Sequence, residues 1–277
     1  MATIQKIGLI GCGNMGSALI SGLCQQGYSP AAISVSDHHA DHTDKLHAKW
    51  PIILQNNNQE LTKSSEILIL AVKPAGLKSL IEEIRPAFDP RKTLLISLAA
   101  GITTQQMTRW MGLQGDLPIV RAMPNTPALI NLGMTGLFAT EKVNELQKTL
   151  TENLFKSVGE TIWLPTEAQM DVVTALSGSG PAYFFYFIEG LQQAAMQLGL
   201  SPAIALKLSL QTALGSATLA SESTEELAEL RNKVTSVGGT TEQGIRVLKD
   251  AKLADILAST LSAATERARA ISHEYSQ

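Results

Sequence analysis

IGLIGCGNMG, the stretch from Ile7 to Gly16, joins a short apolar segment to a glycine-rich turn. Residues 6–10 predict a buried strand, and residues 15–25 continue with helical periodicity. In a Gly-x-Gly-x-x-Gly turn between strand and helix, the first glycine permits the tight turn, the second lets a pyrophosphate approach the backbone, and the third lets the helix pack on the strand. We therefore predict a dinucleotide-binding loop; the alternative is a purely structural turn.

Further along, strand-like and helix-like segments alternate, which predicts an α/β fold with a doubly wound, mainly parallel sheet. The predicted strands are 33–36, 67–72, 93–98, 118–122 and 133–139, and the helices between them include 75–85 and 104–111. After Trp163-Leu164-Pro165 no strand is expected, and the predicted helices are 167–176, 181–198, 202–221, 224–235 and 240–272. We expect a Rossmann-type domain over residues 1–164 and an all-helical domain over residues 165–277.

Composition restricts the class of protein further. The 277 residues carry a net charge of −3 with no basic cluster, which argues against a nucleic-acid partner. The longest apolar run, Ala182 to Ile188, is far shorter than the ~20 residues of a membrane span, and the N-terminus lacks the apolar region of a signal peptide. Two cysteines, Cys12 and Cys24, form no disulfide framework, so we expect a reduced, cytoplasmic setting.

The end of the second predicted strand bears on the choice of dinucleotide. Asp37 follows Ser36 there, and an acidic residue at this position bonds the ribose hydroxyls of NAD and repels the 2′-phosphate of NADP. His38 and His39, as well as Ser36 and Asn58, could instead donate hydrogen bonds to that phosphate. The residues by themselves leave NAD and NADP open.

Three further segments lie at the carboxyl ends of predicted strands. Ligands of open α/β sheets bind at this edge. They are Ala71-Val72-Lys73-Pro74, Ser97-Leu98-Ala99-Ala100-Gly101 and Met123-Pro124-Asn125-Thr126-Pro127. Small residues let a flat ring approach the backbone, and the two prolines fix a loop that presents Asn125. Each segment also fits a plain structural role, as a solvated loop, a close helix contact or a turn between domains.

Two glycine-rich entries precede helices of the second half: a flexible polar turn at residues 177–181 and a second turn at residues 236–241. Backbone N–H groups at a helix start form a natural carboxylate site, although each turn could serve only as a cap. No metal site is expected, because His38, His39, His42 and His47 lack the spacing of a metal-binding motif.

Six motifs in this order resemble the pyrroline-5-carboxylate reductase family over nearly the whole chain. They are the glycine turn at 11–16, the strand ends at 71–74, 97–101 and 123–127, LSGSGPAY at 176–183 and VTSVGGTT at 234–241. The resemblance implies hydride transfer from NAD(P)H to the C=N carbon of a cyclic imine, which gives L-proline in the last step of proline biosynthesis. It also implies a homodimer formed through the helical domains and assembled further, for example into a decamer.

The resemblance implies roles for individual residues, with NADP(H) as cofactor, NAD(H) as the alternative, and no metal. The implied cofactor-binding residues are Ile10, Gly11, Cys12, Gly13, Asn14, Met15, Gly16, Asp37, His38, Asn58, Ala71, Val72, Lys73, Pro74, Ala100 and Asn125. The implied substrate-binding residues are Ser179, Ser236, Gly238, Gly239, Thr240 and Thr241, and Thr241 is the implied catalytic residue, placed near the imine nitrogen.

The chain departs from the family pattern at two places. Val237 stands where the family usually has proline, and Asp37-His38 stands where the family often has Asn-Arg or Ser. The alternatives are another imine reductase, a β-hydroxyacid dehydrogenase, and a non-catalytic dinucleotide sensor. A β-hydroxyacid dehydrogenase needs a catalytic lysine in its helical domain, and neither Lys207 nor Lys233 lies in a matching motif.

Overall fold

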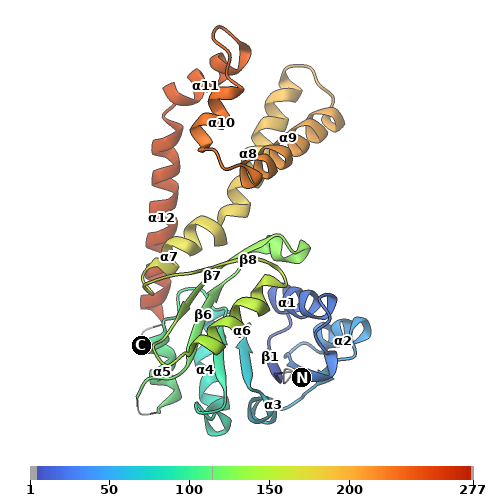
Figure 1. The fold of residues 1–277 in the computed structure, drawn as a ribbon, viewed down its shortest axis with the longest axis vertical. Coiled ribbons are helices and arrows are strands. Elements are labelled where there is room, and N and C mark those ends of the chain that lie inside the picture. The colour runs from blue at the N-terminus through green and yellow to red at the C-terminus, as the bar shows by residue number, and fades with distance from the viewer. Residues whose placement is uncertain (1–4, 114, 276–277) are drawn as a thin grey trace. The chain divides into compact units, whose positions relative to one another are not determined.

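The computed structural model describes residues 5–113 and 115–275, which contain one sheet of eight strands (Figure 1). The strand order is β3-β2-β1-β4-β5-β6-β7-β8. All neighbouring pairs are parallel except β6 and β7. The predicted doubly wound, mainly parallel sheet is therefore confirmed. The strands are β1 (Ile7–Ile10), β2 (Ile33–Ser36), β3 (Ile53–Leu54), β4 (Ile67–Leu70), β5 (Leu94–Ser97), β6 (Ile119–Met123), β7 (Gly133–Ala139) and β8 (Gly159–Trp163).

The order in which the chain adds strands to the sheet reverses at β1. From β1 the chain builds β2 and β3 on one side, then returns to place β4 on the other side of β1. In the register Ile10 lies opposite both Ser36 and Leu70, so the three segments that follow these strands leave the sheet at the same edge. Ligands of open α/β sheets bind at such a switch point.

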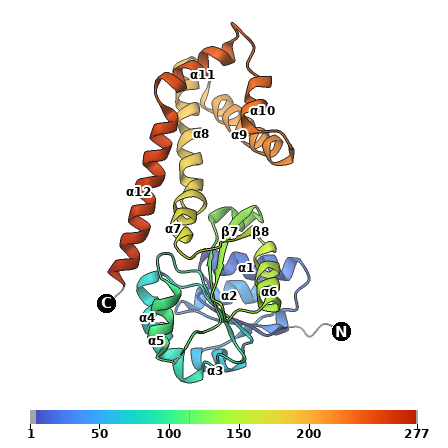
Figure 2. The same cartoon turned by 60° about the vertical axis from the view of Figure 1, so that its left-hand side comes forward.

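Helices cover both faces of the sheet (Figures 1 and 2). One layer comprises α1 (Asn14–Gln25), α2 (Ala40–Lys49) and α6 (Glu145–Lys156), and the other comprises α3 (Asn58–Ser64), α4 (Pro74–Ile84) and α5 (Thr104–Met111). Because side chains of a strand alternate between faces, β1 sends Leu9 to the first layer and Ile10 to the second. Burial on both faces explains why the strand is apolar throughout.

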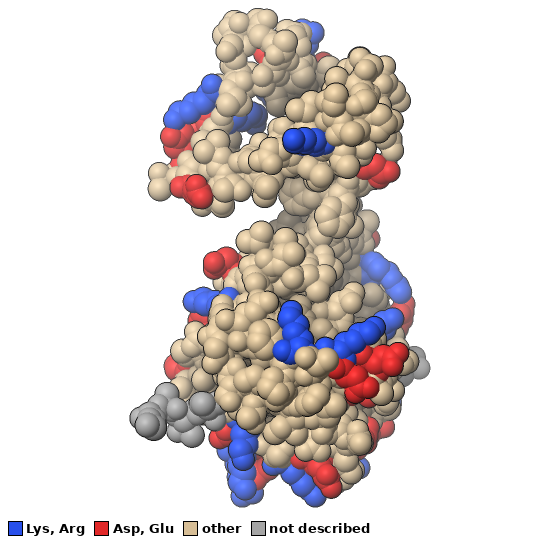
Figure 3. Space-filling model, turned by 90° about the vertical axis from the view of Figure 1, so that its right-hand side faces the viewer, with Lys and Arg blue, Asp and Glu red and all other residues tan. Residues whose placement is uncertain are grey.

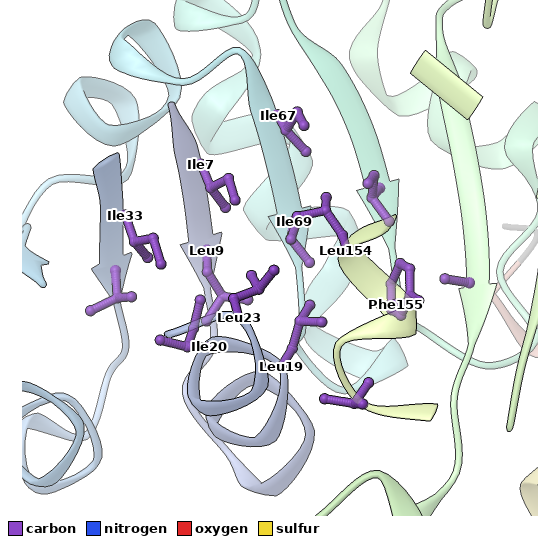
Figure 4. Close-up of a cluster of buried hydrophobic side chains, with 14 of the residues drawn as sticks. Ile7, Leu9, Leu19, Ile20, Leu23, Ile33, Ile67, Ile69, Leu154 and Phe155 are labelled. Carbon is purple, nitrogen blue, oxygen red and sulfur yellow. The ribbon is translucent and has the colours of Figure 1, made fainter. Parts of the chain in front are cut away.

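The first layer encloses the larger buried cluster (Figure 4). Side chains of α1 and α6 point there toward those of β1, β2 and β4. The labelled members are Ile7, Leu9, Leu19, Ile20, Leu23, Ile33, Ile67, Ile69, Leu154 and Phe155. All are nearly inaccessible to solvent, so this cluster fixes α1, and with it the glycine loop, against the sheet.

Two strands were not predicted from the sequence. β3 has only two residues, both exposed, so it lacks the apolar burial that marks the other strands of its half. β8 alternates between half-buried and exposed residues at the edge of the sheet, and its pairing with β7 decides its conformation.

The second half is helical, as predicted. Its elements are α7 (Gln169–Val173), a π-helix (Thr174–Gly178), α8 (Gly180–Gln197), α9 (Pro202–Glu222), α10 (Leu227–Lys233), α11 (Thr240–Asp250) and α12 (Leu253–Glu274). The prediction of one helix over residues 240–272 was wrong, because the chain breaks at Lys252, whose φ of 54° is left-handed. The expected flexible turn at residues 177–181 was also wrong, since a π-helical turn leads directly into α8.

The chain forms two compact units. One extends to Ser179 and includes the segment from Ala263 onward, and the other is Gly180–Ser262. The end of α12 therefore packs with the unit that contains the sheet: Ser272 donates its hydroxyl to the Gly101 carbonyl, and Gln106 Nε2 donates to the Ser272 carbonyl at 2.9 Å. We keep residues 1–164 and 165–277 as the proposed domains, because the last strand of the sheet ends at Trp163.

A buried charge joins the sheet to the segment before α7. Arg121 on β6 is almost fully buried, and its NH1 contacts Glu167 Oε1 at 2.9 Å. The same carboxylate accepts the backbone N–H of Thr104 at 2.7 Å and its hydroxyl at 2.8 Å, at the start of α5. A buried guanidinium needs such a partner, so Glu167 ties three elements of this unit together.

The helical unit exposes a large apolar surface in the single chain. Phe184, Phe185 and Tyr186 of α8 are 69%, 65% and 78% exposed, and in α9 the buried residues are Ala205 and Ser209. Figure 3 shows few charged side chains on the visible face of these helices. Surfaces of this kind mark interaction sites.

Among the described helices, α9 is long and apolar enough to cross a membrane, judged by length and composition. A helix that packs against another protein surface has the same two properties, so they are weak evidence of a span.

We expect Leu214→Arg to convert the protein to a monomer. Leu214 on α9 is 57% exposed in the single chain, and a guanidinium placed in an apolar interface would lose its hydration without a partner. Size-exclusion chromatography with light scattering measures the change in mass. Leu146→Arg on α6 is the control, because Leu146 is 66% exposed on the other unit, and it should leave the mass unchanged. A Leu214→Arg protein with wild-type mass would contradict this interface.

Candidate functional site

The glycine loop is wedged between the ends of β1, β2 and β4. Gly11 has a φ of 102°, and its N–H donates to the Ser36 carbonyl at 2.8 Å. A Cβ on Gly11 would lie 2.6 Å from the Ala71 carbonyl oxygen, and a Cβ on Gly16 would overlap the Gly11 carbonyl. Gly11 therefore requires glycine for both conformation and space, and Gly16 requires it for space.

Gly13 differs from these two glycines, because a Cβ there would meet nothing within 4 Å. Its backbone is extended and caps α1, with no side-chain hydrogen bond to the cap and no acidic residue in the first turn. The N–H groups at the start of α1 are thus available to an anion, and the helix dipole favours negative charge there. This open cradle fits a pyrophosphate, which Ile10 to Met15 were predicted to hold.

Asp37 follows β2 and turns its carboxylate toward the glycine loop. Oδ2 accepts the Cys12 N–H at 2.5 Å, Oδ1 accepts the His39 N–H at 2.8 Å, and His42 Nδ1 lies 3.4 Å from Oδ1. Burial raises the pKa of this carboxyl, but the hydrogen bonds from His39, Cys12 and His42 outweigh burial, and the net pKa is lowered. These hydrogen bonds therefore fix the Asp37 carboxylate beside the glycine loop.

The buried thiol of Cys12 is not a nucleophile. Burial, and secondarily the charge of Asp37, raises its pKa to about 12, which keeps it protonated at neutral pH.

The ends of β4 and β5 lie at the same edge of the sheet. Ala71 N donates to the Ile10 carbonyl at 2.8 Å, which ties the 71–74 segment to the glycine loop. Lys73 is exposed and precedes α4, which starts at Pro74. Ala100 is half-buried between β5 and Gly101, whose φ is 75°. The predicted segment 71–74 is thus brought beside the loop, and segment 97–101 follows the next strand, where Leu98 N donates to the Leu70 carbonyl at 3.0 Å.

Asn58 and Asn125 use their side chains within the protein. Asn58 is buried at the start of α3 and donates to Glu83 Oε1 at 3.0 Å, whereas its Oδ1 has no partner among the described residues. Asn125 accepts the Met134 N–H at 2.8 Å and donates to the Ser177 carbonyl at 3.0 Å. Asn125 therefore fastens the β6–β7 loop to the π-helix, and its role toward the cofactor stays a prediction.

The second predicted site lies in the helical unit, which is described by itself. Gly238 has a φ of 74°, and Gly239 caps α11 without a side-chain hydrogen bond. Glu242 Oε2 accepts the Gly238 N–H at 2.8 Å. The loop thus already binds one carboxylate through its backbone, while Ser236, Thr240 and Thr241 remain exposed. Ser179 belongs to the other unit, where its N–H donates to the Thr174 carbonyl at 2.8 Å.

Two supporting residues were missed from the sequence. Glu242 stands in the first turn of α11, and an acidic residue just after a glycine-rich turn is the signal that indicates it. Ser17 donates its hydroxyl to the Cys12 carbonyl at 2.7 Å and braces the glycine loop, but no sequence signal singles it out.

The sheet, its switch point and the open glycine cradle define a dinucleotide-binding protein of the Rossmann type. Comparison with known proteins agrees. Residues 167–271 match the family model for pyrroline-5-carboxylate reductase dimerisation, and residues 6–101 match the model for coenzyme F420-dependent NADP oxidoreductases. The pyrroline-5-carboxylate reductase of Pseudomonas aeruginosa is 40% identical over 98% of both chains. The chain belongs to the pyrroline-5-carboxylate reductase family.

Solved structures of other members of this family are similar to nearly the whole chain. The pyrroline-5-carboxylate reductase of Coxiella burnetii is 41% identical with a TM-score of 0.93, over 98% of this chain and 99% of that one. The Plasmodium falciparum enzyme, solved with NADP bound, is 29% identical with a TM-score of 0.82, over 97% and 98%. The match to the dimerisation model, which covers α9, supports a homo-oligomer.

Gly13→Ala separates binding from folding. The added methyl group meets no protein atom and should lower the free energy of unfolding by at most about 1 kcal/mol through the N-cap. It stands where a pyrophosphate approaches, so the Kd for the dinucleotide should rise at least ~10-fold. Thermal unfolding and fluorescence titration measure the two effects. Gly190→Ala on α8, also with open space around the Cβ, is the control and should leave the Kd unchanged. Unchanged dinucleotide affinity in Gly13→Ala would remove this loop from the site.

Proposed function

We propose that this protein reduces 1-pyrroline-5-carboxylate to L-proline, the last step of proline biosynthesis, with NADPH or NADH as hydride donor. The observation that carries the proposal is the full-length likeness to pyrroline-5-carboxylate reductases, joined to a glycine loop whose geometry fits a pyrophosphate. Bound there, the dinucleotide supplies a hydride. The chain supplies the binding and the orientation.

The cofactor would be held mainly by backbone. Gly13 and the first N–H groups of α1 would face the pyrophosphate, and Asp37 would lie toward the adenosine ribose; the position of Asp37 directly after β2 supports this assignment. The 71–74 segment and Ala100 would lie along the dinucleotide where it extends from the glycine loop across the edge of the sheet. In this proposal His38, Asn58 and Asn125 complete the cofactor surroundings.

The substrate carboxylate would bind at the start of α11. Ser236 and the backbone of residues 238–241 offer donors there, the helix dipole favours an anion, and Glu242 demonstrates that a carboxylate fits against the Gly238 N–H. A substrate carboxylate would share this turn with Glu242 or displace it. Ser179 is also assigned to substrate binding in this proposal.

The reaction requires little acid–base catalysis from the chain. A cyclic imine is basic enough to be protonated, and the resulting iminium accepts hydride readily. Positioning two reactants can contribute roughly 7–11 kcal/mol to the barrier reduction. Thr241, in the first turn of α11, would orient the imine nitrogen through its hydroxyl.

The assembly and location complete the proposal. We propose a homodimer formed through the apolar surfaces of α8 and α9, assembled further into a higher oligomer such as a decamer. The setting is cytoplasmic, which suits two free, buried cysteines.

The decisive test is oxidation of NADPH and NADH with pyrroline-5-carboxylate. We expect turnover with at least one cofactor and L-proline as product, measured by absorbance at the nicotinamide band and by chromatography of the product. Dinucleotide binding without turnover would favour a sensor, and turnover only with other imines or hydroxyacids would favour those enzymes instead.

Thr241→Ala should lower kcat at least ~10-fold while the dinucleotide Kd stays within about twofold, because the hydroxyl acts on the imine and not on the cofactor. Thr241→Ser should restore most of the activity. Thr149→Ala, which removes an exposed helical threonine from α6, is the control. Wild-type kcat in Thr241→Ala would exclude this residue from the reaction.

A further inference from the structure

Asp37 is fixed where the adenosine ribose of a dinucleotide lies in this fold. Its Oδ2 accepts the Cys12 N–H at 2.5 Å and its Oδ1 accepts the His39 N–H at 2.8 Å. The side chain is only 10% exposed. Rotating the carboxylate away would leave a partly buried backbone donor without its partner, so Asp37 has no inexpensive way to make room for another anion.

The carboxylate suits hydroxyl groups and not a phosphate. An ionised carboxylate accepts hydrogen bonds through about four lone-pair positions and donates none. Three of the observed contacts use Asp37 as acceptor or counterion, which leaves capacity for a ribose hydroxyl. A 2′-phosphate would bring only acceptors and negative charge to the same place.

The surrounding residues offer little to offset that repulsion. Within residues 33–57 the Lys and Arg residues are Lys45 and Lys49, both beyond the first turn of α2, whereas an NADP site usually has an arginine at the strand end. Asp41 adds a second carboxylate in the first turn of α2. The exposed imidazoles of His38, His39 and His42 are the remaining possible donors at this end, and His42 already faces Asp37.

We infer that Asp37 is a specificity-determining residue that discriminates against the 2′-phosphate, so that this protein binds NADH more tightly than NADPH. The inference rests on the proposed dinucleotide site. Discrimination here arises from a repulsive element, the fixed carboxylate of Asp37, and not from a lost contact.

The test is equilibrium fluorescence titration of the full-length protein with NADH and with NADPH, without substrate. We expect the wild-type Kd for NADPH to be at least ~10-fold higher than that for NADH. Asp37→Asn removes the charge and keeps one acceptor oxygen for the Cys12 or the His39 N–H. It should lower the NADPH Kd and narrow the ratio by roughly tenfold, and Asp37→Ser should act in the same direction. The ratio of kcat/KM for the two cofactors should follow the ratio of the Kd values.

Asp44→Asn is the matched control, because it removes an exposed carboxylate from α2, the helix that follows Asp37, and both Kd values should stay unchanged. His38→Ala tests the alternative that His38 binds the 2′-phosphate of NADPH. We expect this variant to leave the ratio of the two Kd values unchanged. A selective loss of NADPH affinity in His38→Ala, or a wild-type protein that binds NADPH as tightly as NADH, overturns the inference. Either result leaves the proposed reduction intact, whereas a protein that binds neither cofactor overturns both.

Discussion

Close contact between backbone segments at the switch point of the sheet is the constraint on which the nucleotide-binding unit depends. The Gly11 N–H bonds the end of β2, its Cα faces the Ala71 carbonyl after β4, and Gly16 packs against Gly11 itself. No side chain fits at either glycine, so α1 starts directly at the sheet edge. Its free N–H groups and the open space at Gly13 follow from that packing.

The helical unit obeys a different constraint. Its helices leave most of their apolar surface uncovered within one chain, and in α9 even the central turns are exposed. Such a unit gains its buried area from a partner, so its folding free energy depends on association. This explains how a chain with only 17% charged residues can devote so many leucines and phenylalanines to positions that are exposed in the monomer.

Much of the fold was predictable because local patterns and tertiary packing agree. Buried parallel strands are apolar on both faces, and proline and serine mark the start of α9, where Ser201 accepts the Ile204 N–H. The failures occurred where pairing or local geometry overrides the pattern. β8 is a strand because β7 pairs with it, and Lys252 interrupts a periodicity that otherwise continues from α11 into α12.

The sequence alone determined the sheet class, the glycine loop and the family, since each depends on residue types at fixed spacings. It also identified Asp37 as relevant to cofactor choice. Tertiary structure decided what those side chains do: Asp37 is held by the Cys12 N–H, Asn125 is committed to Met134 and Ser177, and Glu242 reaches back to Gly238. These are contacts between a side chain and a backbone group brought near by folding, and spacing along the chain does not encode where such a backbone group will lie.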